Sequence, residues 1–230
     1  MRTGRGFSDV ASRHTLLRSG EPRFRRTTTP RAGVPAALAV GYLILTVGVL
    51  TNGPFVRLDL FVDSQVPGRD DGPQFLHDLA MGVITLANPP YTTVALLMVM
   101  LGWALLARSW WPVLASAPPV LVMTSTVLLF KWLVGRAGPP GSGPAGSFGA
   151  FPSGHTATAL VCAATLAALV GFVRPRWASV ARLAAAAWAL LVAWSVVWVH
   201  YHFLNDVLGS FLLGSLVLWA CYRWPWSLRR

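Results

Sequence analysis

The sequence predicts an all-α fold, a polytopic bundle of six transmembrane helices. Its 230 residues are 54% hydrophobic and only 12% charged, and the mean hydropathy is +0.55. A soluble domain could not bury that much apolar surface in one core, so we expect an integral membrane protein. A helix needs roughly 20 apolar residues to span a bilayer, and six segments qualify: 33–53, 84–107, 112–134, 154–173, 183–201 and 205–222.

The second segment is the least regular of the six. Asn88, Pro89 and Pro90 interrupt it, and it is densely apolar only from Thr92 to Ala107. Proline cannot donate a backbone hydrogen bond inside a helix but is tolerated in the first turn. The spanning helix could therefore begin after Pro90.

The basic residues predict the orientation of the bundle, because cytoplasmic loops retain lysine and arginine. With six spans and a cytoplasmic N-terminus, most of the 19 basic residues fall on the inner side. The outer side holds Arg57, Arg69, Lys131 and Arg136. We expect a basic, disordered, uncleaved cytoplasmic tail over 1–32, a membrane domain over 33–222 and a basic cytoplasmic C-terminus over 223–230.

The net charge of +11 does not predict nucleic-acid binding. The excess arginine lies on one predicted side of the membrane, in a tail with few aromatic residues. Membrane topology and anionic lipid headgroups explain such a distribution better than a nucleic acid does. The two cysteines fall within predicted spans, where we expect them to pack as apolar side chains.

Two outer connections are long. Residues 52–86 contain five aspartates, Asp59, Asp63, Asp70, Asp71 and Asp78. We expect them to lie in a solvated loop rather than in a metal site. Within the same connection, residues 74–86 are expected to form an amphipathic helix on the membrane surface. Residues 138–151 are rich in glycine and proline and can hold little regular structure. They are either a flexible linker or the mouth of a site.

Basic residues and a helix start flank that second connection. Lys131 and Arg136 precede it as interfacial anchors or as ligands of an oxyanion such as phosphate. Ser153, Gly154 and His155 follow it, and Ser153 is a good N-cap for the fourth span. A helix N-terminus presents unpaired N–H groups that can bind an anion. The alternative is that Ser153 only caps the helix and that His155 faces water.

The connection between the fifth and sixth spans contains a third polar group. If this junction is helical, His202 and Asp206 are four residues apart and share a face, whereas His200 does not. A carboxylate on one imidazole nitrogen makes the other nitrogen a better nucleophile or base. Because the predicted topology places all three groups on the outer side, together they indicate a phosphoryl-transfer site with two histidines.

These residues resemble the type 2 phosphatidic acid phosphatase superfamily of membrane lipid phosphatases. The family motifs are Lys-x6-Arg-Pro, Pro-Ser-Gly-His and Ser-Arg-x5-His-x3-Asp, and the second is complete at 152–155. The resemblance implies that His202 is the nucleophile, that Asp206 is its partner and that His155 is the general acid. It further implies that Lys131, Ser153 and Gly154 bind the phosphate of the substrate. It also implies a lipid phosphate or polyprenyl pyrophosphate substrate and no metal or other cofactor.

Two positions depart from the family motifs. Gly138 and Val196 stand where the motifs have arginine. The resemblance implies that both arginines bind the phosphate, and each such charge-assisted hydrogen bond is worth about 1.5–3 kcal/mol. Arg136 could replace the first arginine, and Arg57, Arg69 or His200 are candidates for the second. The alternatives to a hydrolase are therefore a silent relative that binds or moves an anionic lipid, and a lipid phosphotransferase.

Overall fold

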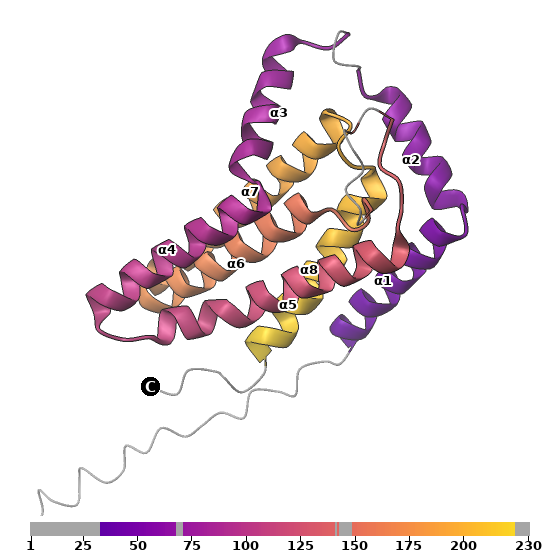
Figure 1. Ribbon diagram of the computed structural model, residues 1–230. Helices are drawn as coiled ribbons and strands as arrows, with labels where there is room; N and C mark the ends of the chain where they lie inside the picture. Colours follow the sequence, from indigo (N-terminus) through magenta and orange to yellow (C-terminus); the bar gives the residue numbers. More distant parts are fainter. Residues whose placement is uncertain (1–32, 68–70, 141, 143–148, 224–230) are drawn as a thin grey trace, which may run out of the picture. The chain divides into compact units, whose positions relative to one another are not determined.

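The computed structural model describes residues 33–67, 71–140, 142 and 149–223 (Figure 1). All regular structure within these ranges is helical: α1 Gly33–Leu50, α2 Pro54–Gln65, α3 Gln74–Leu86, α4 Pro89–Ala107, α5 Trp111–Val134, α6 Gly154–Val173, the 3-10 turn η1 Pro175–Trp177, α7 Ala178–Trp198 and α8 Leu204–Arg223. Six segments of the described chain are long and apolar enough to cross a membrane, namely α1, α4, α5, α6, η1 with α7, and α8. The prediction of an all-α membrane protein with six spans is confirmed. The tail 1–32 and residues 224–230 lie outside the described residues.

The helix boundaries follow the local sequence signals. The span over 154–173 was predicted at both ends, and α4 begins at Pro89, where a proline at the first helical position loses no hydrogen bond. The fifth span was predicted over 183–201, but α7 runs from Ala178 to Trp198. Arg182 is exposed near the start of α7, and its Nη2 donates to Ser179 Oγ at 3.3 Å. This polar first turn lacked the apolar composition on which the prediction rested.

The connection between α1 and α4 carries two helices rather than one. The helix predicted over 74–86 is confirmed as α3, and its location on the bilayer surface stays a prediction. The second helix, α2, was not predicted, and it begins with Pro54 at the first helical position. The expectation of solvated aspartates here is wrong for Asp59, which lies on α2 and is only 1% exposed.

Helix α6 is central to the packing of the spans, with α4, α5, α7 and α8 all contacting it (Figure 1). Small buried side chains line it, among them Ala157, Ala159 and Ala167. Transmembrane helices approach one another closely where their interfaces carry small residues. Contacts on several sides hold α6 in place, so the residues at its N-terminus have a rigid support.

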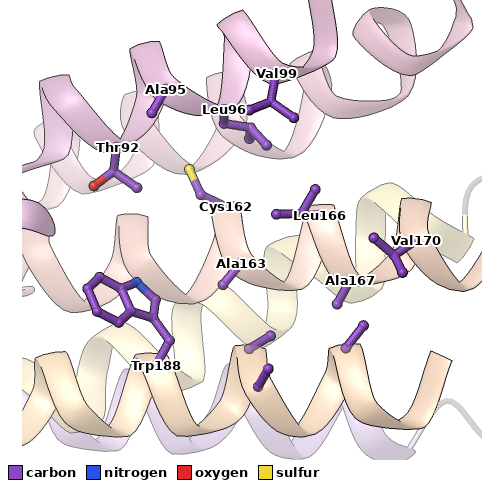
Figure 2. Close-up of a pocket in the computed structure, with 13 residues that line it drawn as sticks. Thr92, Ala95, Leu96, Val99, Cys162, Ala163, Leu166, Ala167, Val170 and Trp188 are labelled. Atoms are coloured by element: carbon purple, nitrogen blue, oxygen red, sulfur yellow. The ribbon is translucent and has the colours of Figure 1, made fainter. Parts of the chain in front are cut away.

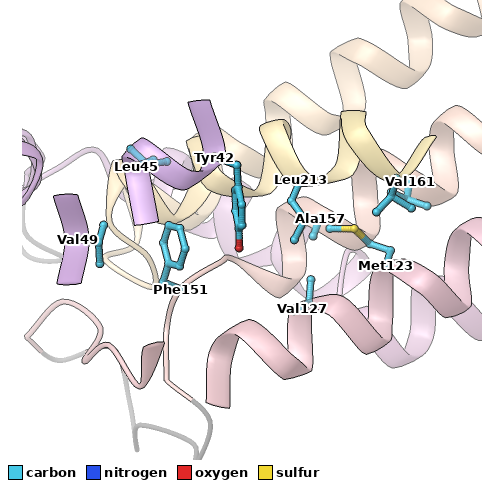
Figure 3. Packing of buried hydrophobic residues seen from close by; sticks show 10 residues of the cluster. Tyr42, Leu45, Val49, Met123, Val127, Phe151, Ala157, Val161 and Leu213 are labelled. Atoms are coloured by element: carbon cyan, nitrogen blue, oxygen red, sulfur yellow. The ribbon is translucent and has the colours of Figure 1, made fainter. Parts of the chain in front are cut away.

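An aromatic cluster fixes the chain just before α6. Phe151 is fully buried, and its ring stacks on Tyr42 of α1 with centroids 5.9 Å apart (Figure 3). Phe130 of α5 meets the same tyrosine edge-on at 4.9 Å. On α8, Gly209 leaves room for Phe151, because a Cβ atom there would lie 2.7 Å from Cε2 of the ring. Three helices therefore position the residue that leads into Pro152 and Ser153.

Candidate active site

The N-terminus of α6 is tied to the N-terminus of α8. Ser153 caps α6, and its Oγ accepts a hydrogen bond from the Thr156 N–H at 3.4 Å. The Ser153 N–H donates to the Asp206 carbonyl at 3.1 Å. Ser210 Oγ lies 2.8 Å from the carbonyl oxygens of both Ser153 and Asp206. These buried hydrogen bonds bring the second and third sequence motifs together.

A cation lies beside the start of α6. Lys131 is in the last turn of α5, and its Nζ donates to the Gly149 carbonyl at 2.7 Å. Its Cε lies 3.8 Å from the position that a Cβ atom on Gly154 would occupy. Among the described residues, no acceptor is found for the N–H groups of Gly154 and His155. A positive charge and two free N–H groups at a helix N-terminus suit an anion.

The two predicted catalytic histidines are neighbours. The ring centroids of His155 and His202 are 6.3 Å apart, with 62° between the ring planes. The ring centroid of Tyr201 also lies 6.3 Å from that of His155. The structure thus brings together residues 47 positions apart in the sequence, close enough for one small substrate group to contact both imidazoles.

His202 does not share a helix with Asp206. Helix α7 ends at Trp198, His200 takes a left-handed conformation with φ of +54°, and α8 begins only at Leu204. The Val196 carbonyl accepts the N–H groups of Tyr201 at 2.9 Å and His202 at 3.1 Å, which turns the chain. The pairing nevertheless forms, since His202 Nδ1 lies 3.4 Å from Asp206 Oδ2. Nε2 is then the nitrogen left for a substrate.

Asp206 is fully buried and has a partner on each oxygen. Oδ2 accepts the Phe203 N–H at 3.0 Å, which caps α8, and Oδ1 accepts Arg136 Nη1 at 2.6 Å. The other guanidinium nitrogen, Nη2, is paired with Asp59 Oδ2, and Cζ stacks 4.6 Å from the Phe203 ring centroid. Arg136 was predicted to bind phosphate, but in this structure its terminal nitrogens contact two carboxylates.

Sequence reasoning missed Asp59 as a site residue. Its Oδ1 accepts the Asn205 N–H at 2.8 Å, so this carboxylate serves both α8 and Arg136. The apolar residues around it gave no signal, because Leu58, Leu60 and Phe61 are exposed in the structure whereas Asp59 is buried.

The two positions that lack the family arginines differ in their burial, since Gly138 is partly exposed and Val196 is not. Val196 is fully buried and packs in a cluster with Val83 and Val207. A Cβ atom on Gly138 would lie 2.7 Å from Ser142 Oγ. Of the substitutes considered, Arg57 is exposed on α2, Arg69 lies outside the described residues, and His200 Nδ1 is 2.7 Å from Asp63 Oδ1.

An apolar cavity of about 430 Å³ opens between α4, α6 and α7 (Figure 2). Thr92, Cys162 and Trp188 line one part of it, and Val99 and Val170 line another. Pro89, one turn before Thr92, lies 3.8 Å from the position of a Cβ atom on Gly154. The helix that forms one wall of the cavity therefore also contacts the start of α6.

Comparisons with known proteins give one family and one solved structure. A family model described as the PAP2 superfamily matches residues 117–230. This range contains all the catalytic and phosphate-binding residues predicted from the sequence, but not Asp59. The similar structure is the crystal structure of the first transmembrane PAP2 type phosphatidylglycerolphosphate phosphatase from Bacillus subtilis. It is 21% identical, with a TM-score of 0.74 over 86% of this chain and 98% of that chain. None of the curated proteins matches.

Proposed function

The chain belongs to the PAP2 superfamily, and from this premise we propose that it is a membrane phosphatase that hydrolyses a lipid phosphate or pyrophosphate. The observation that carries the proposal is the pairing of His155 with His202 beside the N-terminus of α6. The nearby Lys131 supplies positive charge for the phosphate. The free N–H groups of Gly154 and His155 are donors suited to its oxygens.

In the first chemical step, His202 Nε2 attacks phosphorus. The new N–P bond forms as the bond from phosphorus to the lipid oxygen breaks, and His155 gives its proton to that oxygen. Asp206 supports this step, because it lies on the Nδ1 side of His202 and stabilises the positive charge that develops on the ring. The products are a phosphohistidine and the free lipid alcohol, or a lipid monophosphate when the substrate is a pyrophosphate.

In the second step, water replaces the histidine. His155, now without its proton, accepts one from the water that attacks phosphorus, and the N–P bond breaks. Inorganic phosphate leaves and both histidines return to their starting states. The residues supply nucleophile, acid and base from protein side chains, so we expect turnover to continue with a metal chelator present.

Two further features support a lipid substrate on the outer face. The distribution of basic residues favours an orientation in which the helix ends that carry the site lie on the side opposite the arginine-rich termini. The apolar cavity beside α6 lies wholly between spanning helices, where an acyl or isoprenoid chain could lie. Both features suit a substrate with its headgroup at the membrane surface.

Phosphate release by the purified protein tests this function. The panel is phosphatidic acid, phosphatidylglycerol phosphate and undecaprenyl phosphate and pyrophosphate, each in detergent with EDTA. We expect at least one lipid to be hydrolysed by the wild type and none by His202→Ala. Folded wild-type protein that releases no phosphate from any of them would contradict the proposal.

A silent lipid-binding relative is the second candidate. The observation that favours it is the guanidinium of Arg136, which contacts Asp59 and Asp206 and so is not free for phosphate in this structure. In that case anionic lipid would bind equally to wild type and His202→Ala without turnover. A phosphotransferase would instead form product only when an acceptor alcohol is added.

A further inference from the structure

We infer that Asp59 and Arg136 are positioning residues that hold the Asp206 carboxylate against His202. This inference rests on the proposed function and assigns a task to α2, a helix outside the family match. Arg136 bridges Asp59 and Asp206, and Asp206 lies 3.4 Å from Nδ1 of the histidine. The four side chains form one continuous series from α2 to the proposed nucleophile.

The bridge fixes the rotation of the Asp206 carboxylate. Because Oδ1 is bound by Arg136 Nη1 at 2.6 Å, Oδ2 is the oxygen that faces the Phe203 N–H and His202. A planar guanidinium has two terminal nitrogens in a rigid fork, which lets it hold two carboxylates in a set geometry. A lysine, with a single point charge, could not reproduce both contacts.

Charge balance gives the bridge a second effect. The side chains of Asp59 and Asp206 are both fully buried, and that of Arg136 is 10% exposed. Two buried carboxylates that contact the same guanidinium would repel each other if that cation were absent. Arg136 thus places a positive charge between the two carboxylates, one of which lies beside His202.

Asp59 in turn fixes Arg136 relative to α8. Its second oxygen accepts the Asn205 N–H at 2.8 Å, in the first turn of the helix that carries Asp206. Asn205 Nδ2 also donates to the Phe55 carbonyl at 2.7 Å, so α2 and α8 are joined at two points. The residue that orients the nucleophile is therefore anchored from α2 as well as from its own helix.

The same chain offers a matched control for Asp59. Asp63 lies one turn further along α2 and also pairs with a residue from the α7–α8 connection, His200 at 2.7 Å. It contacts neither Arg136 nor Asp206 among the interactions of the described residues. Asp63→Asn therefore weakens the docking of α2 without changing the series that ends at His202.

The test compares steady-state kinetics of Asp59→Asn, Asp59→Glu, Asp63→Asn and Arg136→Lys. For Asp59→Asn and Arg136→Lys we expect kcat to fall about 10- to 100-fold, by analogy with the loss on removing a carboxylate that orients a metal-bound histidine. KM and the inhibition constant of inorganic phosphate should stay within about twofold of wild type, since no phosphate ligand is lost. Asp59→Glu should recover part of kcat, and Asp63→Asn should match the wild type.

Two results would overturn the inference. One is an unchanged kcat in folded Asp59→Asn and Arg136→Lys. The other is a changed KM or phosphate inhibition in these variants, which would make Arg136 a phosphate ligand that Asp59 merely restrains.

A second readout does not depend on activity. Nitrogen NMR of histidine-labelled protein in detergent reports the tautomer of His202, with His202→Ala to assign its signals. We expect Asp59→Asn to change these signals and Asp63→Asn to leave them unchanged. A wild type that releases no phosphate would contradict the proposed function alone, whereas His202 signals unaffected by Asp59→Asn would contradict the positioning role.

Discussion

His202 Nδ1 lies 3.4 Å from Asp206 Oδ2, although one residue belongs to the α7–α8 connection and the other to the first turn of α8. The backbone N–H of His202 donates a hydrogen bond to the Val196 carbonyl, and the backbone N–H of Phe203 donates one to the Asp206 carboxylate. The Nδ1 atom is buried and has no hydrogen bond in the described part of the chain. Asp206 is therefore the group that can stabilise a proton or charge there.

Replacing Asp206 by asparagine should leave the fold intact and remove most of the activity. The amide keeps the size of the carboxylate, but it carries no charge to stabilise the imidazolium and can favour the wrong tautomer. We expect kcat for lipid phosphate to fall by about 10²- to 10⁴-fold. Phosphate release measures the loss, and thermal unfolding in detergent checks the fold. A folded Asp206→Asn variant with near wild-type kcat would show that His202 needs no carboxylate.

Replacing His155 by alanine should produce an enzyme that depends on its leaving group. Without the general acid, hydrolysis of a lipid phosphate should fall by about 10²- to 10⁴-fold. p-Nitrophenyl phosphate carries a leaving group that departs without protonation, so we expect a burst of p-nitrophenol from His155→Ala as the phosphohistidine forms. His202→Ala serves as the control and should show no burst. Equal losses on both substrates would argue against His155 as the acid.

The close packing of Phe151 against Gly209 of α8 predicts that a larger residue at position 209 destabilises the fold. Alanine at Gly209 would place a Cβ atom 2.7 Å from a ring that is fully buried and cannot swing aside. We expect a loss of about 1–3 kcal/mol in unfolding free energy, as overpacking typically costs. Gly102→Ala is the control, because no atom lies within 4 Å of its added methyl group. Thermal unfolding of both variants should separate them, and equal stabilities would mean that Phe151 can shift.

The sequence predicted the parts of the site that depend on local patterns. Apolar length gave the spans, and Ser153 followed by an apolar run gave the start of α6. The predicted topology of the spans placed Lys131 and the two histidines on the same side of the membrane. These features need only neighbouring residues or the topology of whole helices, both of which a single sequence contains.

The contacts of Asp59 and Arg136 could not be predicted in this way. They join residues 77 positions apart through a helix whose docking depends on the tertiary fold. The α7–α8 junction was predicted from helical spacing, but α7 ends at Trp198 and His200 beyond it takes a positive φ that its residue type does not require. His202 Nδ1 and Asp206 Oδ2 are 3.4 Å apart although the two residues do not share a helix, so the assumed helical geometry is wrong and the catalytic role of the pair stays a prediction.

The cavity between α4, α6 and α7 predicts a dependence on the length of the lipid chain. Ala185 lines this cavity, whereas the adjacent exposed Ala186 does not. If a long chain lies there, Ala185→Leu should raise KM for a long-chain substrate several-fold and leave a short-chain, water-soluble analogue unaffected. Ala186→Leu should change neither value. Kinetics on the two substrates measure this, and identical KM values for Ala185→Leu and wild type would place the chain elsewhere.

The distribution of arginine predicts that α2 faces the outside and the α6–α7 turn faces the cytoplasm. Single cysteines can report this, since the chain has only two cysteines to remove, Cys162 and Cys221. Ser64 on α2 and Ser179 at the start of α7 are both exposed. In intact cells, an impermeant maleimide should label Ser64→Cys and leave Ser179→Cys unlabelled until the membrane is opened. The reverse pattern would place the histidines at the cytoplasmic surface, and the substrate would then have to be a lipid phosphate of the inner leaflet.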